Sequence, residues 1–244
     1  MKSLSIVVCA VASLLAAHAA EQPLLAIPGK VIVECKLDAA PVAPWVMPKG
    51  KWELVEGVVR GSEKPEDKHG AVARLPNKLA DYVIDYEFKF EGGKAHSLSI
   101  NAAKEHMARI MITPQFVSVL RDGSHDGTRK PDLYARFAVN FAAGSWHKVH
   151  MEMVGDTVLG KVDELVAWGS SDAFKQDRFG PGLTVAGQSA DFRNLSVREA
   201  TLNPEWEKVK ATLPKPGEKL APMPPPAARP GAKKAPAKAP AKTE

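Results

Sequence analysis

Residues 82–91 read YVIDYEFKFE, and they decide the fold class because apolar and charged side chains alternate along them. Every even-numbered position is aromatic or aliphatic, and the odd-numbered positions from 85 onward are charged. Successive side chains of a β-strand point to opposite faces, so this period of two predicts a strand with one face in a core and one in water. Gly92 and Gly93 then predict a turn at the end of the strand.

Shorter runs of the same kind recur on both sides of this strand, with turn residues between them. They lie at 52–60, 97–101, 109–113, 116–120, 146–154, 157–162, 165–168, 183–185 and 191–198. Gly155 and Asp156 predict a two-residue turn within this series, and Asp163 and Glu164 predict another. Many short strands separated by turns predict an all-β protein, an antiparallel β-sandwich or jelly roll. We expect this domain to span residues 21–199.

A short helix is expected over residues 200–213, packed on the end of the sandwich. Asn203 is a good N-cap, Pro204 suits the first helical position, and Pro214 ends the segment. Trp206 begins an apolar stripe along the helix, which predicts packing against the sandwich. The alternative is that Trp206 docks another domain.

The composition limits the class of protein. The chain has 244 residues, of which 45% are hydrophobic and 25% charged. These values are ordinary for a folded domain and exclude a wholly disordered chain, a collagen-like fibre and a polytopic membrane protein. Residues 214–244 hold seven basic and two acidic residues, whereas residues 21–213 hold 25 basic and 26 acidic ones. The folded part therefore has no basic excess that would indicate nucleic-acid binding.

The C-terminal residues 214–244 differ in composition from the rest of the chain. Nine of the 20 prolines lie there, and large apolar residues are almost absent. Such a segment buries too little surface to offset the entropy of ordering it, so we expect a disordered Pro/Ala/Lys-rich tail. It serves either as a solvated spacer or as an attachment to an acidic envelope polymer.

The N-terminal residues 1–20 have the layout of a secretory signal peptide. Lys2 supplies the positive charge, residues 4–17 are apolar, and Ala17-His18-Ala19 is a cleavage pattern. The apolar run is shorter than the ~18–20 residues that span a bilayer. We therefore expect a periplasmic or extracellular protein with no transmembrane segment after cleavage.

We expect no cofactor and no metal. Cys35 is the only cysteine that follows the predicted signal peptide, and its strand-like surroundings predict a buried apolar residue. The polar loop at 122–132 is rich in oxygen ligands that Ca²⁺ could use, but its spacing is not that of an EF-hand loop. Arg129 and Lys130 also oppose a cation there, so the main interpretation is a rim loop around a binding face.

Four short sequence segments occur in the same order as in a known family. They are WELVEGVVRG at 52–61, DYVIDYEF at 81–88, WHKVHMEMVGD at 146–156 and FRNLSV at 192–197. Together they resemble the 3-keto-disaccharide hydrolase domain family over residues 40–199. The resemblance implies a concanavalin A-like jelly roll of a secreted bacterial protein, sugar binding on the concave sheet, and hydrolysis of a 3-keto-glycoside.

Two segments depart from that family. Residues 96–101 read HSLSIN where the family often has Asn-Ser-Gly followed by an apolar residue. Residues 185–190 read VAGQSA where the family often has Leu-Gln-x-His-Gly. Because both are expected to face a ligand, the resemblance supports the fold more firmly than the hydrolysis.

The candidate catalytic residues are Asp85, Glu87, His150 and Glu152. Asp85 and Glu87 share one strand face about 6.5–7 Å apart, which suits the two carboxylates of a glycosidase. His150 and Glu152 share another polar face and could act as a general base pair. In both cases the alternative is an ordinary solvated strand face.

The candidate substrate-binding residues are Ser99, Asn101, Arg109 and Arg193, whose side chains can hydrogen-bond sugar hydroxyls. The two arginines could instead form structural ion pairs. Trp45, Trp146 and Trp168 could stack on a pyranose ring or belong to the core. Two functions remain open: an enzyme acting on carbohydrate, or a non-catalytic envelope protein that binds a glycan or a protein partner.

Overall fold

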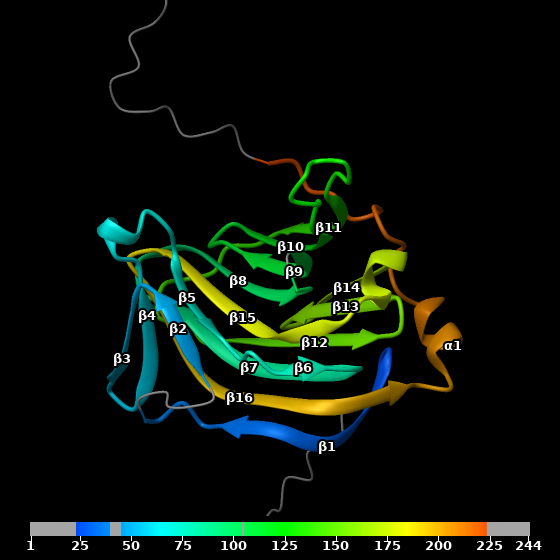
Figure 1. Ribbon diagram of the computed structural model, residues 1–244. Helices are drawn as coiled ribbons and strands as arrows, with labels where there is room; N and C mark the ends of the chain where they lie inside the picture. The colour runs from blue at the N-terminus through cyan, green and yellow to red at the C-terminus, as the bar shows by residue number, and fades with distance from the viewer. Residues whose placement is uncertain (1–22, 40–44, 104, 224–244) are drawn as a thin grey trace, which may run out of the picture.

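The structure is a computed structural model that describes residues 23–39, 45–103 and 105–223 (Figure 1). It consists of two antiparallel β-sheets packed face to face, with one short helix, α1 (Trp206–Lys210). The predicted antiparallel β-sandwich is confirmed. The predicted signal peptide and residues 224–244 of the predicted tail lie outside the described residues.

The first sheet, called sheet A, has the strand order β14-β13-β12-β7-β16-β4-β3, and β1 also pairs with β16. Its strands are β14 (Leu165–Ser170), β13 (Thr157–Val162), β12 (His147–Val154), β7 (Tyr82–Phe90), β16 (Ser189–Leu202), β4 (Val58–Ser62), β3 (Lys51–Val55) and β1 (Ala26–Cys35). The stretch 82–91 thus supplies a central strand, as its alternation predicted. Figure 1 shows β1 beside β16, the strand with which it pairs.

The second sheet, called sheet B, has the strand order β11-β10-β9-β8-β15-β5-β2, and β6 also pairs with β15. Its strands are β11 (Asp132–Ala138), β10 (Phe116–Arg121), β9 (His106–Ile112), β8 (Gly93–Asn101), β15 (Arg178–Gly187), β5 (Ala71–Arg74), β2 (Val46–Lys49) and β6 (Lys78–Leu79). Two 3-10 helices, η1 (Pro65–Asp67) and η2 (Asp172–Lys175), lie in the connections.

The core lies between the inner faces of the two sheets. Sheet A contributes Ile84, Phe88 and Phe192, and sheet B contributes Leu98 and Ile110, all fully buried. His96 also lies in this core, where its Nε2 is 2.6 Å from the Tyr86 hydroxyl and its Nδ1 is 3.0 Å from the Thr184 carbonyl oxygen. This hydrogen bond from Tyr86 to His96 links the two sheets.

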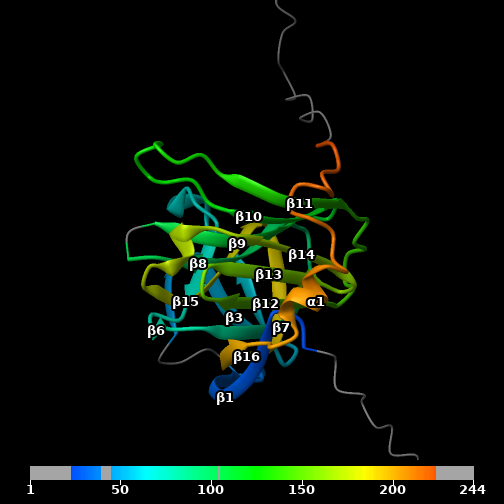
Figure 2. The same cartoon turned by 90° about the vertical axis from the view of Figure 1, so that its right-hand side faces the viewer.

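A second apolar cluster covers part of the outer face of sheet A. Leu25, Val83, Val154, Leu159 and Trp206 are buried together there. Figure 2 shows α1 over β7, β12 and β13, the strands that supply the sheet residues of this cluster. Packing of Trp206 on the sandwich agrees with the first of the two sequence-based alternatives.

The helix begins at Trp206, because Pro204 and Glu205 form a turn before it. The side-chain amide nitrogen of Asn203 donates to the carbonyl oxygens of Pro23 and Leu24, and its Oδ1 accepts from the Glu205 amide at 3.0 Å. Asn203 therefore caps the turn that leads into the helix and also ties this turn to the residues before β1.

The predicted boundary of the folded part at residue 214 is too early. Residues beyond it run along the edge of β11, where the Arg136 amide donates to the Lys219 carbonyl oxygen at 2.6 Å. The Ala221 amide donates back to Arg136 at 2.9 Å, and Leu220 forms a parallel bridge with that residue. Figures 1 and 2 show this segment beside β11. Within the described residues, no helix is long and apolar enough to span a bilayer.

Candidate functional site

The predicted site residues fall on opposite outer faces of the sandwich. Asp85, Glu87, His150 and Arg193 line a pocket of about 600 Å³ on sheet A. Ser99, Asn101 and Arg109 line a pocket of about 310 Å³ on sheet B. Glu152 lines neither and is 2% exposed. The structure therefore separates the predicted catalytic residues from most of the predicted substrate-binding residues.

In the sheet A pocket, His150 lies between two carboxylates. Its Nδ1 is 2.7 Å from Oδ1 of Asp85, and its Nε2 is 2.7 Å from Oε1 of Glu152. Burial by itself lowers the pKa of His150, but the hydrogen bonds and charges of Asp85 and Glu152 outweigh it and raise the pKa to about 9. His150 is therefore an imidazolium at neutral pH, with both ring nitrogens donating, and it has no lone pair to act as a base.

Glu152 anchors the N-terminal strand. Its Oε2 accepts hydrogen bonds from the backbone amides of Leu25 at 2.7 Å and Ala26 at 2.9 Å. Its other oxygen accepts from His150. The buried Glu152 carboxylate is held in place by these three donors and is out of reach of a ligand in either pocket.

The Glu87 carboxylate accepts hydrogen bonds from two neighbouring side chains of β16, Arg193 and Asn194. Nε and Nη2 of Arg193 donate to its Oε2 at 2.9 and 2.6 Å, and Nδ2 of Asn194 donates to its Oε1 at 3.0 Å. Burial raises the pKa of Glu87, but the hydrogen bonds from Asn194 and Arg193 outweigh this and lower it below its usual range. The Arg193 guanidinium also lies 4.0 Å from the ring centroid of Trp146. Glu87 is thus a poor proton donor, and one face of Trp146 is occupied.

The sheet B pocket is built on one row of cross-strand neighbours. Arg74 on β5 pairs with Gly182 on β15, Gly182 with Ser99 on β8, and Ser99 with Arg109 on β9. Three strand spacings of about 4.8 Å separate β5 from β9, so the backbones of the two arginines lie about 14 Å apart. A glycine and a serine lie between them, so the row forms a shallow floor with an arginine at each end.

His106 and Asn101 lie at one end of that floor. Nδ1 of His106 is 2.5 Å from Oδ1 of Asn101 and donates to it, which leaves Nε2 as the ring acceptor. Burial of the ring and the charge of Arg109 lower the pKa of His106 below its usual value. In contrast to His150, His106 is neutral at pH 7 and carries a free lone pair.

The polar loop after β10 is a closed turn. Oδ1 of Asp126 accepts from Ser124 Oγ at 2.5 Å and from the Thr128 amide at 3.0 Å. These hydrogen bonds lower the pKa of Asp126 to about 2. Arg129 forms an ion pair with Glu105 at 2.7 Å, which fixes the loop to the connection between β8 and β9. Within the described ranges, no three His, Cys, Asp or Glu side chains are grouped to hold a metal ion.

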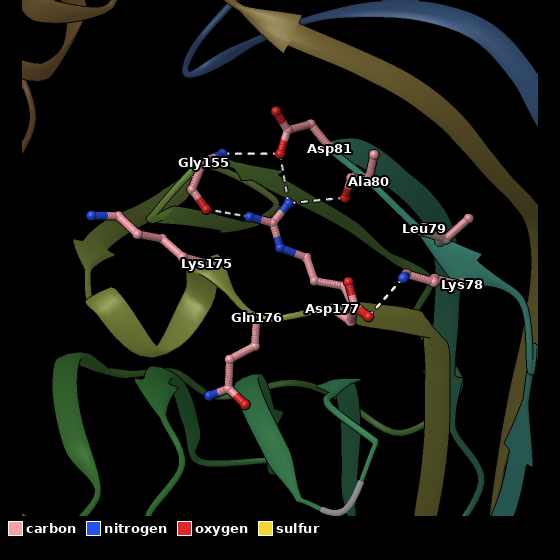
Figure 3. A pocket seen from close by; sticks show the side chains of 9 residues that line it. Lys78, Leu79, Ala80, Asp81, Gly155, Lys175, Gln176 and Asp177 are labelled. Atoms are coloured by element: carbon pink, nitrogen blue, oxygen red, sulfur yellow. Dashed lines mark hydrogen bonds and ion pairs between the residues drawn. The ribbon is translucent and has the colours of Figure 1, made fainter.

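A further pocket, of about 440 Å³, surrounds the buried guanidinium of Arg178. This group donates to the carbonyl oxygens of Ala80 and Gly155 and to Oδ1 of Asp81 (Figure 3). It also donates to the carbonyl oxygen of Phe174. All of its N–H directions are used within the protein. Arg178 therefore ties the ends of four segments together, which is a structural role.

The remaining residues that the sequence singled out pack against other side chains of the protein. Trp45 packs on the core, and Trp168 packs edge-on against Trp206 with ring centroids 5.8 Å apart. Cys35 is a free, half-buried cysteine. Sequence reasoning missed Arg74 and Thr184 as pocket residues, because their faces become clear only when β5 and β15 are placed beside β8.

No protein-family model matches the sequence, and no curated protein matches it. Among solved structures, a Bacillus subtilis protein with a galectin-like fold has a TM-score of 0.57 at 12% identity, over 73% of this chain and 100% of that one. SCLam, a non-specific endo-β-1,3(4)-glucanase from family GH16, has a TM-score of 0.52 at 10% identity, over 74% and 96%. This chain has a jelly-roll fold. The resemblance to the 3-keto-disaccharide hydrolase domain family stays a prediction.

Proposed function

We propose that this protein binds carbohydrate in the sheet B pocket. The observation that carries the proposal is the row Arg74–Gly182–Ser99–Arg109, with Asn101, His106 and Thr184 beside it in one pocket. Hydroxyl, amide and guanidinium groups around a shallow floor suit a ligand that presents many hydroxyls. The glucanase fold neighbour acts on carbohydrate, which agrees with this proposal.

The residues of the sheet A pocket do not suit glycosidase catalysis, which also favours binding without catalysis. Asp85 is hydrogen-bonded to His150, and Glu87 is bound by the Arg193 guanidinium, which lowers the pKa of Glu87 below its usual range. A glycosidase needs one carboxyl group that keeps its proton near neutral pH. We therefore assign the sheet A residues to stabilising the fold.

Hydrolysis of a 3-keto-glycoside is the second candidate, and one observation favours it. His106 is neutral, is oriented by Asn101, and lies in the sheet B pocket. A base oriented by a hydrogen-bonding partner is the arrangement that proton abstraction requires. If the protein is an enzyme, we expect His106 to be the base and Glu87 to be dispensable.

The binding proposal is tested by filling the floor of the pocket. A Cβ added at Gly182 would meet no heavy atom closer than 3.6 Å, so a side chain can start at this position without a clash, and we expect Gly182→Leu to occupy the space for a ligand. We expect Gly182→Leu to weaken binding to a glycan array by at least about ten-fold. Gly29→Leu on sheet A is the matched control, because its added Cβ would meet nothing closer than 3.4 Å. Unchanged binding by Gly182→Leu would place the ligand elsewhere.

The second candidate is tested with a panel of 3-keto-disaccharides, following release of 3-keto-glucose. Release that disappears in His106→Ala and persists in Glu87→Gln would support an enzyme that acts in the sheet B pocket. If a folded sample binds glycans but releases no 3-keto-glucose, the protein binds carbohydrate without hydrolysing it. We also propose that the protein is exported, on the layout of residues 1–20.

A further inference from the structure

The sheet B pocket is lined by positive and neutral groups. Among the described residues that line it, the ionisable ones are Lys49, His69, Arg74, His106 and Arg109, and no carboxylate is included. This composition contrasts with the sheet A pocket, where four carboxylates are mixed with four basic side chains. The folded part of the chain has no basic excess, so the positive lining is a local feature of this pocket.

The positive groups in this pocket are only partly neutralised. Within the described part of the chain, the Arg74 guanidinium and the Lys49 ammonium form no hydrogen bond or ion pair. Arg109 contacts Oδ1 of Asp122 through Nη2 at 3.1 Å, but its buried Nε has no partner among the described residues. A buried N–H without an acceptor costs free energy that a bound acceptor would recover.

The environment of His106 agrees with a positive potential in this pocket. Besides burial, the charges of Arg109, His125 and His69 all lower the pKa of this imidazole, and Asp122 opposes them. The cationic side chains of Lys49 on β2, Arg74 on β5 and Arg109 on β9 line the same space. Such a potential attracts an anionic ligand and repels a cationic one.

We propose that the ligand of this pocket is an anionic saccharide, whose carboxylate or sulfate groups are bound by Arg74 and Arg109. This inference rests on the proposed carbohydrate-binding function and names the ligand class. Guanidinium groups bind both oxyanions through paired N–H donors, and the separation of about 14 Å between the arginine backbones leaves room for sugar units over Gly182 and Ser99. No aromatic ring other than imidazole lines the pocket in the described residues, so charge and hydrogen bonds must supply the affinity.

The test compares three oligosaccharides of similar length with the full-length protein. They are an oligogalacturonate, its carboxyl-reduced neutral counterpart, and a sulfated carrageenan oligosaccharide without carboxylates. Binding is measured by titration calorimetry at low and physiological salt. We expect at least one anionic ligand to bind about ten-fold or more tightly than the neutral one, with the advantage reduced by salt.

Three variants connect the result to this pocket. Arg74→Ala and Arg109→Ala should each weaken anionic binding by about ten-fold. Asp122→Asn removes the carboxylate that competes for Arg109 and should tighten binding several-fold. Arg198→Ala is the matched control, because Arg198 is exposed on sheet A and the charge change is the same. The basic C-terminal residues are present in all four proteins.

The outcomes separate this inference from the proposed function. Equal binding of the neutral and anionic ligands, lost in Gly182→Leu, would overturn the anionic preference and keep carbohydrate binding. Binding of no saccharide would overturn both. Anionic binding that Arg198→Ala reduces as much as Arg74→Ala would reflect overall charge and would also overturn the assignment to this pocket. The ligand that binds more tightly identifies the oxyanion.

Discussion

At the scale of single residues, His150 and His106 show how neighbours decide the chemistry of one residue type. His150 has a carboxylate at each ring nitrogen, whereas His106 has an amide oxygen at one nitrogen and positive groups nearby. The first is therefore a fixed cation and the second a neutral acceptor. Sequence spacing placed His150 among the catalytic candidates, and the two carboxylates at its ring nitrogens support the structural role that we propose for it.

The titration of His150 predicts a loss of stability at alkaline pH. Its folded pKa of about 9 lies above the usual 6.5, so its contribution is complete below pH 6.5 and is lost as pH rises through 9. The loss in the free energy of unfolding should be at most about 3 kcal/mol. Urea denaturation between pH 6 and 9.5 measures it, with His150→Gln as reference. Parallel curves for the two proteins would contradict the prediction.

Replacing Glu152 should loosen the N-terminal strand. Glu152→Gln removes the negative charge that accepts from Leu25, Ala26 and His150, and we expect a loss of about 2 kcal/mol or more in the free energy of unfolding. Hydrogen exchange at the Leu25 and Ala26 amides should accelerate. Glu199→Gln, at an exposed position on β16, is the control. Because Glu152 is outside both pockets, glycan binding should persist in the folded variant.

At the scale of elements, the strands could be predicted from alternation, and their pairing could not. The stretch 82–91, the hairpins around Gly155 and Asp163, and the strand at 191–198 are where the pattern placed them. The pattern gives each strand two faces without saying which strands are neighbours. Ser99 and Asp85 were both polar positions on alternating strands, yet β8 and β7 lie in different sheets. The split of the site into two pockets follows from that pairing.

The contact between β7 and β8 predicts a loss of stability in acid. His96 accepts from Tyr86 across the core, and burial lowers its pKa to about 4. Its folded pKa lies below the usual 6.5, so unfolding binds a proton, and stability present above pH 6.5 is lost as pH falls through 4. Thermal melts from pH 7 to 4 should show this fall. In His96→Leu the protein is less stable throughout, and the acid-dependent part of the fall should shrink.

At the scale of the whole molecule, the C-terminal residues protect the edge of sheet B. Backbone hydrogen bonds join Gly217, Lys219 and Ala221 to β11, the terminal strand of that sheet. An uncovered edge strand offers unpaired N–H and C=O groups to another chain. Low apolar content predicted disorder from residue 214, but backbone pairing needs no large side chain, and this is why composition failed there.

Removing these residues should therefore destabilise the protein and promote association. A chain ending at residue 213 should lose about 2–4 kcal/mol relative to one ending at residue 223, from three backbone hydrogen bonds and the packing around them. Melting temperature and light scattering measure the two effects. The chain ending at 223 should match the full-length protein. Identical behaviour of both truncated chains would show that the edge needs no cover.

The pairing of β1 with β16 also determines when the fold can be completed. Asn203 binds the carbonyl oxygen of Pro23, 180 residues earlier, and the whole of β1 has β16 as its partner in sheet A. β1 must therefore wait until β16 has been synthesised, and the long closure that joins these two strands is entropically costly and slow. Until then its apolar residues are available to chaperones and to other chains.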